Sequence, residues 1–291
     1  MKGLPTDALL TIADGPIVVQ LLPRVGARLH RIQAFGHDLL RTPDDPGEHA
    51  RDPLSWGAYV MAPWCNRIGA TPTDVDGQVV SVPSNFADGT AIHGQVYDVP
   101  WRQREAGLLW VRAGGDGWPW AYESTIRLTV RGPVVLIRQS LTNLAGTPMP
   151  AGLGLHPWFR RPLEVRVDAA NVLGSNLDPD AVVEPCSDSL DLRTMQPVPD
   201  DLDASWLKPG DPAVELRWPE LGLTAVMRSR SDAGLSIAVA SPSSLDAVAI
   251  EPQTNLPQGL RRYLHREPGR LHPLAPRATI SLTTELTFRR S

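Results

Sequence analysis

Short segments in which apolar or β-branched residues alternate with polar ones recur along most of this 291-residue chain. Such alternation places successive side chains on opposite faces of the backbone, which is typical of a strand with one buried face. A long example spans residues 278–288. Others span residues 16–21, 78–82, 108–112, 123–130, 134–141, 163–167, 214–218, 223–227 and 235–240. The pattern predicts an all-β fold, because such strands must bury one face against another layer.

Turn signals separate these segments and leave little room for helices. Pairs such as Asp76-Gly77 lie between predicted strands, and the chain contains 29 prolines and 24 glycines. We expect one short helix, at residues 200–207. Residues 42–53 and 178–212 are too short or too mixed in composition to act as linkers. The sequence therefore predicts a single domain over residues 1–291, built from large antiparallel sheets with few short helices.

Charge and composition argue against several classes of partner. The formal net charge is -4, from 28 basic and 32 acidic residues, so no positive field favours nucleic acid or an anionic membrane surface. No apolar stretch approaches the roughly 18 residues of a spanning helix, and nothing resembles a signal peptide. Cys65 and Cys186 are too few for a disulfide scaffold or a zinc site. We expect a cytoplasmic protein without nucleic-acid or membrane partners.

Three short motifs carry the side chains that point to chemistry. His93 lies in the segment 91–94, His156 in the segment 153–159, and Glu251 in the segment 249–254. A carboxylate that is ionised at neutral pH and an imidazole that titrates near pH 7 together suit proton transfer. Clusters with zinc-ligand spacing, glycine-rich loops opening a helix and Gly-x-Ser-x-Gly motifs are absent from the sequence. We therefore expect an enzyme that works without metal or cofactor.

These motifs, taken in order, resemble those of the aldose 1-epimerase (galactose mutarotase) family, and the resemblance runs nearly end to end. The matching segments are residues 26–29, 62–68, 92–94, 118–119, 155–159 and 251–254. There are two small departures: Pro-Trp follows His156 where the family has Pro-Tyr, and a single glycine follows His93 where many members have two. The resemblance implies a β-supersandwich of galactose mutarotase-like fold with an open cleft on one sheet.

The resemblance also implies roles for particular side chains in interconverting the α and β anomers of a sugar. Glu251 would take the proton of the C1 hydroxyl, and His156 would deliver a proton to the ring oxygen. Substrate would be bound by His93, Arg67, Asn66, Asp203 and Gln253. Independently of the resemblance, we expect Trp158 or Trp64 to offer an apolar surface facing the sugar. The implied partner is a small-molecule sugar, and the sequence leaves the oligomeric state open.

The acidic residue that would contact sugar hydroxyls has two candidates. Residues 202–206 are similar to a Leu-Asp-x-x-Phe element of the family, which favours Asp203. Residues 191–193 are similar to its Asp-x-Arg turn, which favours Asp191. The sequence alone does not choose between them.

Other interpretations stay open at this point. Glu251 could be a structural carboxylate paired with an arginine, and His156 a hydrogen-bonded core histidine. The same chemistry could serve a hexose 6-phosphate or a sulfonated sugar if arginines line the cleft. The candidates for such a cluster are Arg160, Arg161, Arg261 and Arg262. A third interpretation is a carbohydrate-binding β-sandwich without catalysis.

Overall fold

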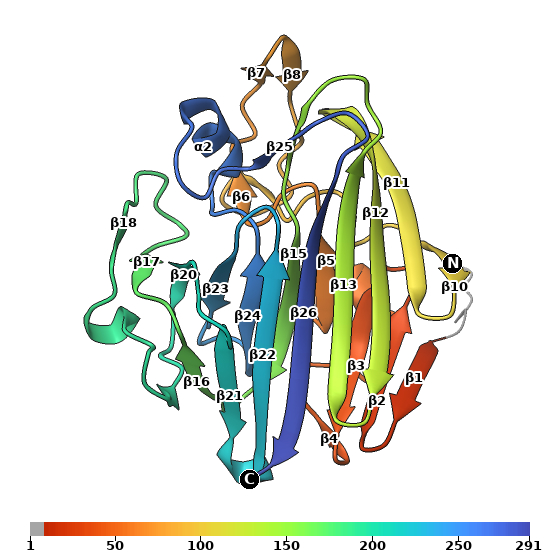
Figure 1. The fold of residues 1–291 in the computed structure, drawn as a ribbon, viewed down its shortest axis with the longest axis vertical. Helices are drawn as coiled ribbons and strands as arrows, with labels where there is room; N and C mark the ends of the chain where they lie inside the picture. The colour runs from red at the N-terminus through yellow and green to blue at the C-terminus, as the bar shows by residue number, and fades with distance from the viewer. Residues whose placement is uncertain (1–8) are drawn as a thin grey trace.

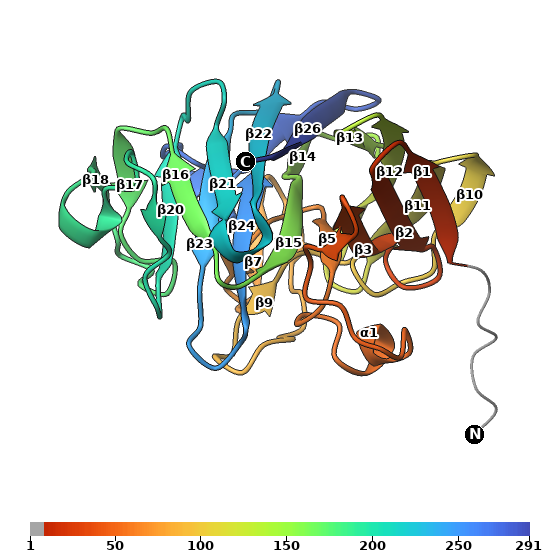
Figure 2. The same ribbon diagram turned by 90° about the horizontal axis from the view of Figure 1, so that it is seen from below.

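Two large antiparallel sheets lie face to face in the computed structural model, which describes residues 9–291 (Figures 1 and 2). One sheet runs in the order β1(Leu10–Asp14), β2(Ile17–Leu22), β3(Arg28–Ala34), β5(Ala58–Met61), β15(Gly154–Arg160), β24(Ala247–Gln253), β23(Ser236–Ala240), β20(Asp203–Leu207), β17(Asn171–Leu173) and β18(Val183–Pro185), with β4(His37–Asp38) beside β3. We call it the cleft sheet, because the candidate site lies on it.

The second sheet, which we call the back sheet, runs in the order β10(Arg102–Glu105), β11(Leu108–Gly115), β12(Trp118–Arg131), β13(Val134–Asn143), β26(Thr279–Arg290), β22(Leu223–Ser231), β21(Val214–Trp218), β16(Glu164–Val167) and β19(Gln196–Pro197). Three two-stranded ribbons complete the strands of residues 9–291: β6(Arg67–Ile68) with β9(Ala91–Ile92), β7(Thr73–Val75) with β8(Gln78–Val80), and β14(Met149–Ala151) with β25(His272–Leu274). The helices of the same range are α1(Glu48–Arg51), α2(Gly259–His265) and the 3-10 turns η1(Asp188–Leu190) and η2(Pro219–Leu221). The predicted β-supersandwich with few short helices is confirmed.

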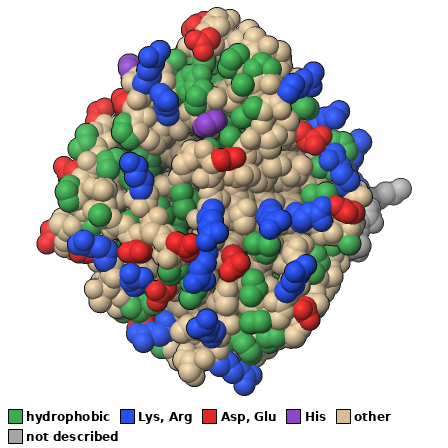
Figure 3. All heavy atoms as spheres, in the orientation of Figure 1, with side chains coloured by type: hydrophobic (Ala, Val, Ile, Leu, Met, Phe, Trp, Pro, Cys, Tyr) green, Lys and Arg blue, Asp and Glu red, His purple; other side chains and the backbone are tan. Residues whose placement is uncertain are grey.

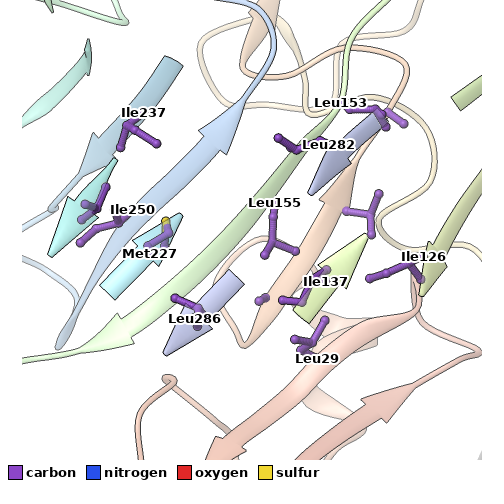
Figure 4. Close-up of a cluster of buried hydrophobic side chains, with 14 of the residues drawn as sticks. Leu29, Ile126, Ile137, Leu153, Leu155, Met227, Ile237, Ile250, Leu282 and Leu286 are labelled. Carbon is purple, nitrogen blue, oxygen red and sulfur yellow. The ribbon is translucent and has the colours of Figure 1, made fainter. Parts of the chain in front are cut away.

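Alternating side chains from both sheets form the core between the layers. In β12 every second residue from Trp118 to Val130 is buried, as the period-two pattern predicts. Figure 4 shows Ile126 and Ile137 of the back sheet pointing toward Leu29, Leu155 and other side chains of the cleft sheet. This packing leaves the opposite face of the cleft sheet free to carry polar groups.

The helix predicted at residues 200–207 is wrong. Residues 203–207 form β20, which pairs with β17 on one side and β23 on the other. Ala204 and Trp206 are buried in the sandwich. Pairing with the neighbouring strands therefore decides the conformation of this short segment, rather than the intrinsic propensity of its own sequence. The correction moves Asp203 to the start of a strand in the cleft sheet.

The outer face of the back sheet presents basic and acidic side chains side by side (Figure 3). Arg228 and Arg230, for example, both form ion pairs with Asp211. No helix in residues 9–291 is both long and apolar enough to cross a membrane. The candidate site lies on the opposite side of the molecule, where the segments carrying α1 and β9 cover the cleft sheet (Figure 2).

Candidate active site

Strand register brings an imidazole and a carboxylate together at the centre of the cleft sheet. Gly154 pairs with Gln253 and Trp158 pairs with Ala249, so His156, midway between, lies opposite Glu251. His156 Nε2 is 3.2 Å from Glu251 Oε1. Both residues are almost completely buried, with exposed fractions of 4% and 2%. Two side chains 95 positions apart in sequence therefore form one proton-handling pair.

Burial shifts the pKa values of this pair in opposite directions. It raises the pKa of Glu251 well above its usual value, with the nearby Asp203 adding to the rise, because a buried carboxylate loses its hydration. It lowers the pKa of His156 to about 3, because an imidazolium is disfavoured for the same reason. Between these two titrations the pair holds a single proton, and the 3.2 Å contact lets that proton move between Oε1 and Nε2.

His93 stands beside this pair with one ring nitrogen already occupied. The backbone N–H of Asn66 donates to His93 Nδ1 over 3.2 Å, and the backbone N–H of His93 donates to the Asn66 carbonyl. Burial and the neighbouring His156 and Arg67 hold the pKa of His93 well below 6.5. The ring is therefore neutral with its proton on Nε2, which is free to donate a hydrogen bond to a ligand.

A tight turn after His93 sets the position of this ring. Gly94 has φ +80°, and a Cβ added to it would lie 1.9 Å from the Ala62 carbonyl oxygen. The backbones of residues 62 and 94 thus approach as closely as glycine allows, which explains the His-Gly pair in the motif. The β6–β9 ribbon, in which Arg67 pairs with Ile92, carries both Arg67 and His93 to the cleft.

Arg67 supplies the positive charge of the site and is held by three neighbours. Its Nε donates to Asp88 Oδ2 over 2.8 Å, and its Nη1 donates to Asn66 Oδ1 over 3.1 Å. Asp203 Oδ2 lies 3.6 Å from Nη1, while Asp203 Oδ1 accepts from Asn176 over 2.7 Å. Burial raises the pKa of the Asp203 carboxyl. The guanidinium is thereby fixed in orientation at the edge of the cleft.

Most of the substrate-binding residues singled out from the sequence line this cleft, and two do not. The lining includes His156 and Glu251 together with His93, Arg67, Asn66, Asp203 and Trp158. The cavity measures about 360 Å³, in the usual range for small-molecule sites. Gln253 is fully buried, is absent from the lining, and donates to Ser205 Oγ over 3.4 Å. Trp64 is also buried elsewhere, donating to the Ala91 carbonyl.

Of the two acidic candidates and the four candidate arginines, Asp203 alone lines the cleft. Asp191 is ion-paired with Arg193 away from the cleft, whereas Asp203 lines it. Arg161 pairs with Asp200, and both Arg261 and Arg262 pair with Glu267. Among the described residues, the lining of the cleft includes Arg67 but neither these three arginines nor Arg160. A phosphate-binding arginine cluster is therefore missing from the cleft wall that the structure describes.

Tyr59 is the main site residue that sequence reasoning missed. It pairs with His156 across β5 and β15, and its ring stacks on the imidazole with centroids 4.4 Å apart and planes at 20°. The other lining residues not singled out are Leu54, Phe86, Ile92, Leu177, Asp201, Leu202, Ala240 and Pro242. Tyr59 lies in a strand-like run just before the Pro63-Trp64 element, but only the pairing of β5 with β15 shows what it touches.

Metal ligation gains no support from the side chains of residues 9–291. His, Cys, Asp and Glu do not gather there in any group of three or more that could hold a metal ion. Cys65 and Cys186 are both buried free thiols. The chemistry that the arrangement can perform on its own is proton transfer to and from a bound ligand.

Comparison with known proteins agrees with the motifs. Residues 9–254 match the family model described as aldose 1-epimerase. A galactose mutarotase-like protein from Clostridium acetobutylicum superposes with a TM-score of 0.81 at 16% identity, covering 97% of this chain and 95% of that one. A galactose 1-epimerase from Lactobacillus acidophilus NCFM gives 0.73 at 14% identity, with coverages of 97% and 94%. A galactose mutarotase-like protein from Lactobacillus casei ATCC 334 gives 0.71 at 14% identity, with coverages of 97% and 100%. No sequence among the curated proteins matches the chain.

Proposed function

This chain belongs to the aldose 1-epimerase family, and from that premise we propose that it interconverts the α and β anomers of a neutral free aldose. The observation that carries the proposal is the contact of 3.2 Å between His156 Nε2 and Glu251 Oε1 inside a cleft of sugar size. Anomer exchange needs one group that removes a proton and another that supplies one, and this pair contains both.

The reaction follows from the single proton that the pair holds. In its reactive form the proton lies on His156 and Glu251 is a carboxylate, which is a tautomer of the neutral pair and needs no proton from solvent. Glu251 takes the proton of the C1 hydroxyl, while His156 gives its proton to the ring oxygen. The bond between C1 and the ring oxygen breaks as the C1 carbonyl forms. Rotation about the C1–C2 bond and the reverse steps then yield the other anomer.

His93 and Arg67 orient the sugar and stabilise charge on its oxygens. The His93 Nε2–H can donate to a sugar oxygen, since Nδ1 already accepts from Asn66. The Arg67 guanidinium, held by Asp88 and Asn66, presents a fixed positive charge as the hemiacetal opens. Asp203 and Asn66 are placed to bind hydroxyls, and the indole of Trp158, which donates to the Leu54 carbonyl, gives the wall an apolar surface.

The charge of the cleft favours a neutral substrate over a phosphorylated or sulfonated one. Among residues 9–291, its lining includes the acidic residues Asp201, Asp203 and Glu251 but only one arginine, Arg67, which is already ion-paired. A phosphate or sulfonate would meet repulsion there without the bidentate partners that stabilise such groups.

The test is anomer exchange of α-glucose and α-galactose, followed by NMR or polarimetry. We expect wild-type protein to accelerate exchange, and Glu251→Gln and His156→Ala each to lower the acceleration about 10²- to 10⁴-fold. Part of the sugar binding should survive in both variants. Glu220→Gln and His265→Ala, at exposed positions outside the cleft, serve as matched controls. Wild-type protein that binds sugars yet leaves exchange at the buffer rate would instead support a non-catalytic binding protein.

A further inference from the structure

The row of side chains through the catalytic pair continues onto two more strands. Leu29 pairs with Ala58 between β3 and β5, so Arg28 lies opposite Tyr59. Tyr59 in turn pairs with His156 between β5 and β15. Arg28, Tyr59, His156 and Glu251 therefore form one cross-strand row over four neighbouring strands of the cleft sheet. Side chains directly opposite one another on adjacent strands are close enough to interact.

Contacts follow this register. The Arg28 guanidinium carbon lies 4.8 Å from the centroid of the Tyr59 ring, within cation–π distance. On the next strand, the Tyr59 ring stacks on the His156 imidazole with centroids 4.4 Å apart, and His156 then meets Glu251. The Arg28 guanidinium and the His156 imidazole therefore both contact the Tyr59 ring.

Arg28 is an unusual residue to bury at this place. Its exposed fraction is 0%, and its guanidinium donates to the backbone carbonyls of Trp56, Pro53 and Tyr97. Within the described residues it forms no ion pair with a carboxylate, and Asp98 and Asp52 act on its charge only from a longer distance. A buried cation without a directly paired counterion is costly. This points to a role for the charge itself.

We propose that Arg28 and Tyr59 are positioning residues for the anomer exchange: together they hold the His156 imidazole against Glu251, and the Arg28 charge eases release of the His156 proton to the ring oxygen. The inference rests on the proposed function, because it assigns His156 the role of acid. Neither residue needs to touch the sugar ring oxygen or C1 to act in this way.

The direction in which Arg28 shifts the pKa of His156 agrees with this role. The pKa of His156 is lowered chiefly by burial, and Arg28 lowers it further because a nearby cation disfavours the imidazolium. Removing the Arg28 charge should therefore raise the pKa of His156. The titratable or charged groups that face His156 or lie just beyond its neighbours are Glu251 on β24, Tyr59 on β5, His93 after β9, Arg28 on β3, Arg67 on β6 and Asp203 on β20.

Substitutions of two arginines, Arg28 and Arg41, can distinguish an effect on the position of His156 from an effect on the nearby loop. Arg41 also donates to a backbone carbonyl of this loop, that of Ser55, and lies over the Trp56 ring. The aromatic ring that it covers is thus Trp56, whereas Arg28 covers Tyr59. Arg28→Met and Arg41→Met therefore both weaken the loop that holds residues 53–56, but only Arg28→Met removes the charge behind Tyr59.

The readouts are the pH profile of exchange and the titration of the His156 ring by NMR, with its signal assigned by loss in His156→Ala. We expect Arg28→Met to lower kcat about tenfold with little change in KM. The acid limb of the pH profile, where activity falls as pH decreases, should move up by roughly one pH unit. The pKa of His156 measured by NMR should rise by the same amount, whereas Arg41→Met should shift neither quantity. Arg28→Lys, which keeps the charge, should retain the wild-type acid limb.

Two outcomes would overturn the inference. One is an unchanged pKa of His156 in folded Arg28→Met, and the other is an equal shift of that pKa in Arg28→Met and Arg41→Met. If Arg28→Met does not fold, Tyr59→Phe and Tyr59→Leu decide, because Phe keeps the stacked ring and Leu removes it. Equal kcat values and His156 titrations in those two variants would then contradict the proposal. The NMR titration needs no turnover, so inactive wild-type protein would refute the proposed function without hiding the effect of Arg28.

Discussion

Individual residues in this cleft owe their chemistry to burial. The carboxyl of Glu251 would be ionised near pH 7 if it were exposed, and the imidazole of His156 would titrate close to that pH. In the cleft sheet, burial raises one pKa and lowers the other, so the pair retains one proton over a wide pH range. A pair in this state is equipped to take a proton at one sugar oxygen while giving one at another.

The pH dependence of exchange should show this pairing. As pH falls through about 3, the pair gains a second proton and Glu251 can no longer act as a base, so activity is lost. As pH rises through the raised pKa of Glu251, the pair loses its only proton and activity is lost again. We expect kcat/KM from NMR exchange rates to be flat between these limits. An acid limb near 6.5, the usual pKa of histidine, would show that His156 titrates alone.

At the scale of elements, the site depends on short ribbons and turns attached to a large sheet. β15 and β24 hold His156 and Glu251 in the middle of the cleft sheet, where each strand has neighbours on both sides. Arg67 lies instead on the two-residue strand β6 and His93 directly after β9, and these two strands form a separate ribbon. The close approach of Gly94 to Ala62 ties that ribbon to the end of β5.

Gly94→Ala should therefore damage both stability and activity. Its added Cβ would meet the Ala62 carbonyl at 1.9 Å, whereas Gly77, with the same φ of +80°, has no heavy atom within 4 Å of such a Cβ. We expect Gly77→Ala to lower the free energy of unfolding by about 1 kcal/mol, and Gly94→Ala by at least about 2 kcal/mol more. Chemical denaturation measures both. The displaced His93 should also lower kcat/KM at least about tenfold, and equal effects of the two variants would contradict the role of the close approach.

At the scale of the whole molecule, one apolar layer supports the cleft sheet from behind. The buried cluster between the sheets includes Leu155 and Ile250, the inward neighbours of His156 and Glu251, and side chains of the back sheet such as Ile137 (Figure 4). Side chains that point outward from β15 and β24 thus depend on packing from a sheet that contributes neither His156 nor Glu251. We therefore expect the two sheets to unfold together, as the prediction of a single domain requires.

Ile137→Ala tests this expectation. Ile137 is 1% exposed, and its truncation should lower the free energy of unfolding by about 2 to 5 kcal/mol while leaving one cooperative transition and a wild-type kcat. Circular dichroism and tryptophan fluorescence should give coincident curves. Leu264→Ala, at a position on α2 that is 43% exposed, should change stability by less than about 0.5 kcal/mol. Two separate transitions would argue against a single folding unit.

How far the sequence predicts the site depends on how local each signal is. The motifs around His93, His156 and Glu251 are contiguous, so the sequence alone reveals them. Asp203 and Asp191 were equally available in the sequence, and only the fold places Asp203 3.6 Å from Arg67. The helix expected at residues 200–207 was wrong because five residues are too few for their own pattern to outweigh pairing with β17 and β23.

The sequence by itself determined the class of fold and many of its strands, and its motifs singled out His156 and Glu251 as the proposed acid and base. These depend on alternation and on short motifs, which are properties of neighbouring residues. The tertiary structure alone decided which strands lie beside which, and therefore that Arg28, Tyr59, His156 and Glu251 form one row. Strand pairing joins segments far apart in the chain, and burial within that pairing sets the pKa values, so neither can be read from local sequence.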